Sequence, residues 1–333
     1  MDNKRETYSF VTPEPYNLRP EQQRKFNYDN PTIIITAGPT GSGKSSLLNK
    51  ALELLYKHKE TPVFKSFLID DYVDNSQSYK DIVDNIIDKF KCKESIEPDS
   101  PCDVSNPNQE LIDDLDKAYF EIRENGPCDS SGKSCKELFN IDLKTAIENR
   151  ENILIETTGK DIPLKYVNKI AQLAGLSNYN FLFMYSILDF DPLIDRVKSR
   201  FKKSMTSYLN DKNSSAPRIS NISRDTFKKK TSKIITTLIK LRNECLRLGR
   251  PSNPDCGVIN SNGNFILLIF DNNSMPSKLI YDSRTSHNLM TDGEFITLLN
   301  SYGLEGGKLN ATKRRKNKKR KTLRSKSHKN NKR

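Results

Sequence analysis

Several features that mark other classes of protein are missing or scarce in this chain of 333 residues. It has no tryptophan and only three histidines, and none of its six cysteines forms a C-x-x-C pair, so the spacing typical of a zinc site is missing. No run approaches the ~20 apolar residues of a membrane-spanning helix, and the polar first residues do not resemble a signal peptide. These absences predict a soluble, intracellular protein, cytoplasmic or nuclear, with free thiols and no membrane partner.

Acidic residues are missing from one end of the chain. Residues 308–333 hold 14 Lys or Arg and no Asp or Glu, whereas residues 1–307 carry 41 basic and 42 acidic residues. The net charge of +13 therefore belongs to a tail, which is too polar to pack and is expected to be disordered from residue 304 onward. Such a run neutralises phosphates, so we expect contact with nucleic acid or with the nuclear import machinery. A purely solubilising tail is the alternative, and the tail also resembles those of proteins from large eukaryotic DNA viruses.

One stretch near the start organises the rest of the chain. Residues 38–45 read GPTGSGKS, which fits the phosphate-binding loop pattern G-x-x-x-x-G-K-[ST] with no mismatch. A buried strand is expected before it, at residues 32–36, and leucines at helical spacing follow it. The order strand, loop, helix is what a nucleoside triphosphate site requires. The expected nucleotide-binding residues are Gly38, Pro39, Thr40, Gly41, Ser42, Gly43, Lys44, Ser45 and Ser46.

Two side chains of this loop have expected roles in binding ATP and Mg²⁺. Lys44 would reach the β- and γ-phosphates, and the hydroxyl of Ser45 is placed to ligate Mg²⁺. The glycines let the backbone N–H groups approach the phosphate oxygens, and the helix that begins at Lys44 directs its positive end at the same anion.

The rest of the chain alternates between strand and helix patterns. Strands are expected at residues 63–69, 152–155, 181–188, 265–270 and 278–281, and helices at 78–91, 111–123, 137–149, 163–174, 191–201, 224–248 and 292–300. This alternation predicts an α/β protein with a P-loop NTPase or kinase fold: a mostly parallel sheet with helices on both faces. The expected divisions are a polar arm (1–30), one kinase-like domain (31–303) and the tail (304–333). Within the domain, residues 92–136 are a polar insertion without a core of its own, and residues 204–223 are a lid-like segment.

Charged residues near the expected strand ends are the candidates for chemistry. Asp70 and Asp71 follow the strand at 63–69, and Glu156 follows the strand at 152–155. Either site could orient an acceptor hydroxyl, take its proton, or hold Mg²⁺ through water. Arg196, Arg200, Arg218 and Arg224 surround the lid-like segment and are candidate clamps for triphosphate, although a solvated basic face would look the same.

Taken together, these motifs resemble the zeta-toxin family of P-loop kinases over residues 30–245. The telling segments are I-E-T-T-G-K at 155–160 and D-P-L-I-D-R-V-K-S-R at 191–200, beside the phosphate loop and Asp70-Asp71. The resemblance implies a kinase that phosphorylates a hydroxyl of a nucleotide sugar such as UDP-N-acetylglucosamine. It implies that Asp70, or else Asp71, is the general base, that Glu156 binds the acceptor, and that Arg196 or Arg200 together with Arg218 clamps ATP. Lys160 stands where the family often has arginine, and no antitoxin partner can be inferred from one chain.

Three functions remain open at this point. The first is an ATP-dependent kinase that acts on a small-molecule hydroxyl. The second is a nucleoside or polynucleotide kinase, which the basic tail would suit. The third is an NTP-dependent switch that phosphorylates no substrate, with residues 67–71 as a Walker-B-like strand. The acceptor, the oligomeric state and the choice between Asp70 and Asp71 are not determined by the sequence.

Overall fold

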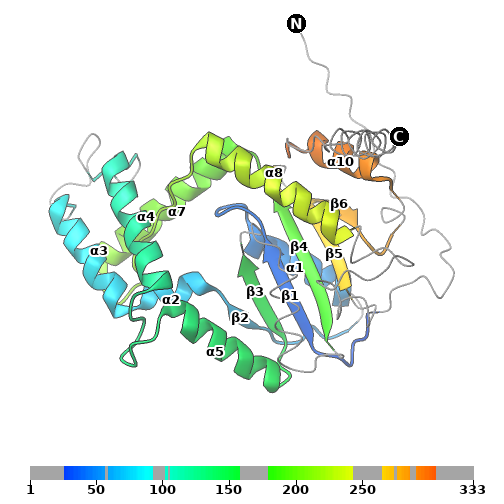
Figure 1. Ribbon diagram of the computed structural model, residues 1–333, viewed down its shortest axis with the longest axis horizontal. Helices are drawn as coiled ribbons and strands as arrows, with labels where there is room; N and C mark the ends of the chain where they lie inside the picture. Colours follow the sequence, from blue (N-terminus) through cyan, green and yellow to red (C-terminus); the bar gives the residue numbers. More distant parts are fainter. Residues whose placement is uncertain are drawn as a thin grey trace, which may run out of the picture.

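The computed structural model describes residues 26–56, 59–92, 102–103, 106–157, 179–242, 265–273, 276–285 and 290–304. Its centre is a six-stranded sheet in the order β2-β3-β1-β4-β5-β6 (Figure 1). The first five strands are mutually parallel, and β6 pairs with β5 antiparallel at one edge. The predicted fold class is confirmed: this is a mixed α/β protein with a P-loop kinase-like fold.

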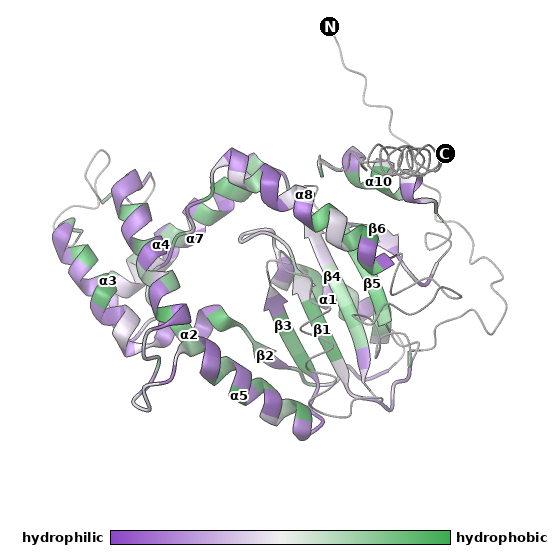
Figure 2. Cartoon of the chain, in the orientation of Figure 1, coloured by the Kyte–Doolittle hydropathy of each residue, from purple (hydrophilic) through white to green (hydrophobic). Residues whose placement is uncertain are grey.

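The strands at the middle of the sheet are buried throughout. They are β1 (Thr32–Ala37), β4 (Asn180–Ile187) and β5 (Phe265–Asp271); β3 (Ile153–Thr157) and β6 (Lys278–Asp282) lie nearer the two edges. Figure 2 shows these central strands as the most hydrophobic part of the chain. Near-continuous apolar runs are expected of parallel strands covered on both faces.

The second strand is shorter than the sequence predicts. Only Lys65–Phe67 forms β2, and Val63 is 91% exposed. The chain turns at Leu68 into helix α2 (Ile69–Asn75), so Asp70 and Asp71 lie in the first turn of a helix and not at a strand end. The prediction of a strand over residues 63–69 is therefore wrong before Lys65 and beyond Phe67. Asp70 and Asp71 are acidic residues in a first helical turn, where the helix dipole favours them.

Helices cover both faces of the sheet. Helix α1 (Lys44–Tyr56) packs on one face through Leu47, Ala51 and Leu55. Helices α5 (Cys135–Glu148), α8 (Arg224–Lys240) and α10 (Asp292–Ser301) contribute to the core on the other face. The helices expected at 137–149 and 292–300 are confirmed, and the one expected at 224–248 is confirmed as far as Lys240. The helix expected at 163–174 lies outside the described residues.

A second, helical core stands beside the sheet. Helices α2, α3 (Gln77–Lys89), α4 (Gln109–Glu124) and α7 (Phe190–Asn210) form it, and they make the group of helices on the left of Figure 1. Residues 106–136 contribute Leu111, Leu115 and Ile122 to this core. The insertion was expected to lack a core of its own. Its described part packs into a common core with α3 and α7, because α4 is amphipathic and buries its apolar face there.

The lid-like segment proves to be structured over its first part. Residues 204–210 continue α7, so the helix expected at 191–201 is nine residues longer at its C-terminal end. Residues 211–223 form an irregular connection to α8 in which Ala216 and Ile219 are buried. The apolar residues Met205 and Tyr208 explain the longer helix, since they extend the buried stripe of α7.

Four of the cysteines are paired. Cys92 bonds Cys102 and Cys128 bonds Cys135, and these two disulfides flank α4 at its two ends. The prediction of free thiols is therefore wrong for these four residues, because folding of the insertion brings each pair of Cα atoms to 5.1 and 4.8 Å. Among the described helices, none is long and apolar enough to cross a membrane.

Candidate active site

The phosphate loop lies where the direction of the chain across the sheet reverses. Strand β1 stands between β3 and β4, so the loop after β1 opens at the switch point where α/β sheets bind ligands. Gly41 and Gly43 have φ values of +84° and +78°, which only glycine adopts without strain. A Cβ atom on Gly43 would also lie under 3.0 Å from the side chain of Asn272. The loop therefore needs glycine at both places to take the shape of a phosphate cradle.

Two polar side chains at the ends of neighbouring strands fix this loop. Ser186 Oγ, on β4, donates a hydrogen bond to the carbonyl of Ser42 at 2.6 Å. Asn272 Nδ2, just after β5, donates to the same carbonyl at 2.5 Å. With Ser42 held from two strands, the loop backbone is set before any ligand arrives.

Lys44 is buried at the floor of the site. Its ammonium lies 3.1 Å from Glu156 Oε1 and donates to the carbonyls of Gly38 and Pro39, each at 3.1 Å. Burial lowers the pKa of Lys44, and the nearby Glu156 carboxylate opposes that shift. Glu156 therefore faces the phosphate loop and holds the lysine at the loop.

Asp70 stands on the opposite side of the site and is held by two donors. The hydroxyl of Tyr119, from α4, donates to Asp70 Oδ1, and Arg218 Nη1 lies 2.5 Å from Asp70 Oδ2. Burial is the largest influence and raises the pKa of Asp70, but Arg218 and Tyr119 outweigh it and hold the pKa below its usual value. Asp70 is therefore an ionised carboxylate at neutral pH.

The two neighbouring aspartates differ in their surroundings. Asp70 lines the cavity, whereas Asp71 is exposed and does not line it. Burial raises the pKa of Asp71, and the charge of Asp70 raises it further. Of the two candidates that the sequence left open, Asp70 is the one at the site.

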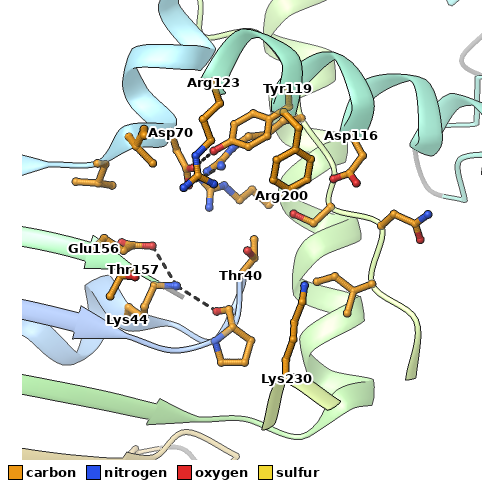
Figure 3. Close-up of a pocket in the computed structure, with 18 of the residues that line it drawn as sticks. Thr40, Lys44, Asp70, Asp116, Tyr119, Arg123, Glu156, Thr157, Arg200 and Lys230 are labelled. Carbon is orange, nitrogen blue, oxygen red and sulfur yellow. Dashed lines mark hydrogen bonds and ion pairs between the residues drawn. The ribbon is translucent and has the colours of Figure 1, made fainter. Parts of the chain in front are cut away.

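A cavity of about 240 Å³ joins these groups (Figure 3). In Figure 3, Lys44 and Glu156 lie on one side, and Asp70 and Tyr119 lie across the cavity from them. The phosphate loop, α2, α4, α7, α8 and residues 218–222 all contribute to its walls. The charged side chains that line it are Lys44, Arg123, Arg200, Arg218, Lys230, Asp70, Asp116 and Glu156. Five cations against three carboxylates suit an anionic ligand.

The candidate arginines have different positions. Arg200 lines the cavity, and Arg196 lies over the phosphate loop, where it donates to the carbonyl of Asn272 at 3.3 Å. Arg218 also lines the cavity but contacts the aspartates of α2, which the sequence did not predict. Arg224 pairs with Asp191 on the surface at 2.5 Å and does not line the cavity, so its candidacy is not supported.

Mg²⁺ requires few protein ligands when phosphates supply the others. Ser45 lies at the first turn of α1 with an exposed side chain, at the mouth of the phosphate loop. Within the described part of the chain, no group of three or more His, Cys, Asp or Glu could hold a metal ion on its own. The hydroxyl of Ser45, beside the phosphate loop, is a donor that fits Mg²⁺ brought in with a nucleotide.

Several cavity residues were not predicted from the sequence. Asp116, Tyr119, Phe120 and Arg123 come from α4, in a segment whose sequence looks like a polar insertion. The signal was present only as an amphipathic helix with two aromatic residues, and nothing local relates it to Asp70. Lys160, with Thr158 and Gly159 before it, lies outside the described residues.

Comparisons with known proteins do not indicate which reaction this protein performs. No family model and no curated protein matches this chain. Among solved structures, it is similar to one from the PezAT chromosomal toxin–antitoxin system of the human pathogen Streptococcus pneumoniae. That likeness has a TM-score of 0.37 and 10% sequence identity, and it covers 84% of this chain and 88% of the other. A likeness at this level says nothing of the reaction.

Proposed function

We propose that this protein is a phosphotransferase that moves the γ-phosphoryl group of ATP to a hydroxyl of a small molecule. The observation that carries the proposal is the pairing of a phosphate loop with an ionised, partly buried aspartate across one cavity. Lys44 and Asp70 both line it, from opposite sides. Phosphoryl transfer needs a cradle for the phosphates and a carboxylate to orient the attacking hydroxyl, and little else from the protein.

Each residue of the site has a role in this proposal. Backbone N–H groups of the phosphate loop and the Lys44 ammonium would bind the β- and γ-phosphates. Arg200, and Arg196 over the loop, would neutralise charge on the transferring group. When bound, Mg²⁺ would draw negative charge from the phosphates, and Ser45 is the residue that would hold it.

Phosphoryl transfer would form one bond to the γ-phosphorus and break another. The acceptor oxygen bonds to the γ-phosphorus, the bond from that phosphorus to the β-γ bridging oxygen breaks, and ADP leaves. Asp70 orients the acceptor hydroxyl and takes its proton, which is then released to solvent. Glu156, at the floor of the cavity, would bind the acceptor or keep Lys44 in place.

The acceptor is the least constrained part of the proposal. The resemblance in the sequence favours a nucleotide sugar such as UDP-N-acetylglucosamine, and the excess of cations in the cavity suits an acceptor that carries phosphate. A nucleoside or polynucleotide kinase is the second candidate, supported by the basic sequence at residues 308–333.

The test is transfer from labelled ATP with Mg²⁺ to a panel of nucleotide sugars, nucleosides and 5′-hydroxyl oligonucleotides. Lys44→Ala is the blank, because it removes the buried ammonium. Lys144→Ala is the matched control, since Lys144 forms only an exposed pair with Glu148 on α5. We expect transfer to a small hydroxyl compound that disappears in Lys44→Ala alone. Tight ATP binding with no transfer to any member of the panel would favour a nucleotide-dependent switch instead.

A further inference from the structure

A second carboxylate lies behind Asp70, away from the cavity. Asp74 is one helical turn further along α2, so its side chain shares a face of the helix with Asp70. It is 7% exposed and does not line the cavity. The proposed reaction gives this residue no role, although it is a buried charged group beside the site.

Arg218 joins the two aspartates. Its Nη1 lies 2.5 Å from Asp70 Oδ2, and its Nε lies 3.1 Å from Asp74 Oδ2. The guanidinium is planar and its donors are fixed relative to one another, so a bond at Nε sets where Nη1 points. The ring of Tyr119, 5.5 Å from the guanidinium carbon, limits its movement on a further side.

The backbone around Arg218 is attached to α2 and α3. Ala216 N–H donates to the carbonyl of Asp74 at 2.8 Å. Tyr79, at the start of α3, donates through its hydroxyl to the carbonyl of Pro217 at 3.0 Å. The segment before Arg218 therefore follows the position of α2, and the remaining freedom of the arginine is that of its side chain. Asp74 is the group that restricts this freedom.

We propose that Asp74 is a positioning residue for phosphoryl transfer, which acts through Arg218 to fix the direction of the Asp70 carboxylate. This inference rests on the proposed function, because the direction of Asp70 matters only if Asp70 orients an acceptor hydroxyl.

The cost of burying Asp74 argues against a role in stability alone. Its Oδ1 is buried and has no hydrogen-bond partner among the described residues. Burial raises the pKa of Asp74 to about 7, against the opposing charge of Arg218. The other charged groups that face it are Asp70, Asp71 and Arg200. A buried ion pair with an unsatisfied oxygen is weak evidence for a gain in the free energy of unfolding, which leaves the geometry of Arg218 as its role.

The first experiment compares kcat and KM in two variants at Asp74. Asp74→Asn keeps the shape and one acceptor oxygen, and Asp74→Ala removes both contacts. We expect kcat to fall at least tenfold in Asp74→Asn and further in Asp74→Ala, with KM for ATP within twofold of the wild-type value. Asp84→Asn is the matched control, since Asp84 pairs with Lys212 in the same connecting segment and touches neither Arg218 nor the cavity.

The pH profile of kcat separates positioning from a general structural role. In the wild type, protonation of Asp74 below pH 7 would release Arg218, so kcat should fall on the acid side with an inflection near pH 7. That inflection should vanish in Asp74→Asn and persist in Asp84→Asn. A kcat within twofold of wild type in Asp74→Asn, or an unchanged profile, would overturn the proposal.

A readout without phosphate transfer keeps this inference distinct from the proposed function. The Nε–H proton of Arg218 is buried against Asp74 and should give a protected NMR resonance, identified by its loss in Arg218→Lys. We expect Asp74→Asn to shift or broaden it, and Asp84→Asn to leave it unchanged. If wild type transfers phosphate to nothing, the proposed function fails whatever this resonance does. If the resonance ignores Asp74→Asn, the positioning role fails even in an active enzyme.

Discussion

The hydroxyl of Tyr119 donates a hydrogen bond to Asp70, and so a residue of α4 contacts the proposed base on α2. Burial raises the pKa of Tyr119, and the charge of Asp70 raises it further, so this hydroxyl remains a donor. Tyr119 also belongs to the segment that looks like an insertion in the sequence. The proposed base is therefore set by two elements that the sequence does not relate to it, α4 and the connection that carries Arg218.

Removal of the Tyr119 hydroxyl should slow phosphate transfer without abolishing it. In Tyr119→Phe we expect phosphate transfer to fall about ten- to a hundredfold, since a hydrogen bond to a charged group contributes about 1.5–3 kcal/mol. The pKa of Asp70 should rise because the hydroxyl helps to lower it. The fall in rate that follows protonation of Asp70, which lies at lower pH than the inflection assigned to Asp74, should then move to higher pH. Tyr72→Phe is the control, because the Tyr72 hydroxyl bonds Asp142 and does not line the cavity; equal effects in both variants would contradict this role.

Two glycines with similar backbone angles should respond differently to substitution. Gly43 has φ of +78°, and a Cβ atom added there would collide with the side chain of Asn272. Gly132 has φ of +76°, and no described atom lies within 4 Å of a Cβ atom added there. Gly43→Ala should abolish ATP binding, because the new Cβ displaces Asn272 from the phosphate loop. Gly132→Ala should cost about 1 kcal/mol of stability through backbone strain and leave ATP affinity unchanged. Calorimetric titration with Mg·ATP measures the ATP affinity of both variants, and urea denaturation measures their stability. Retained affinity in Gly43→Ala would contradict the loop geometry.

The sequence predicted the parts of the site that are local. The phosphate loop, Lys44 and the pair Asp70-Asp71 are recognisable because their pattern lies within a few residues, although the sequence placed that pair at a strand end and not in a helix. Asp74, Tyr119 and Asn272 were not predicted, since each depends on which helix or strand end comes to lie beside another. The cysteines were misjudged for the same reason: the pairing of Cys92 with Cys102 depends on how the chain returns between α3 and α4. The sequence of residues 308–333 lies outside the described part, so its disorder and its nucleic-acid contact stay predictions.

The free energy of unfolding should depend on the ionisation of Asp74 between pH 4 and pH 7. Its pKa is raised to about 7 in the folded protein, against an ordinary value of 3.8. Below pH 3.8 the carboxyl is protonated in both states. As the pH rises, the unfolded chain loses this proton first, so the free energy of unfolding falls and levels off above pH 7. Urea denaturation at several pH values should show that Asp74→Asn lacks this decline. A constant difference between the two proteins at every pH would contradict the assigned burial.

The two disulfides should stabilise the helical core beside the sheet. They close loops with sequence separations of 10 and 7, so removal of either should lower the free energy of unfolding by about 2–3 kcal/mol. The double variant Cys128→Ala/Cys135→Ala, unfolded with and without a reducing agent, measures one bridge while the other stays intact. Titration of the denatured, unreduced protein should find at most two free thiols. Six free thiols would contradict both bridges.

The most direct measurement of the central claim is single-turnover transfer from labelled ATP in Asp70→Asn and Asp71→Asn, with ATP affinity measured in parallel. We expect Asp70→Asn to bind ATP with the wild-type affinity and to transfer phosphate at least a hundredfold more slowly. The transfer rate of Asp71→Asn should stay within a few fold of the wild-type rate. Transfer that survives in Asp70→Asn, or that is lost only together with ATP binding, would contradict the assignment of Asp70 as the base of a phosphotransferase.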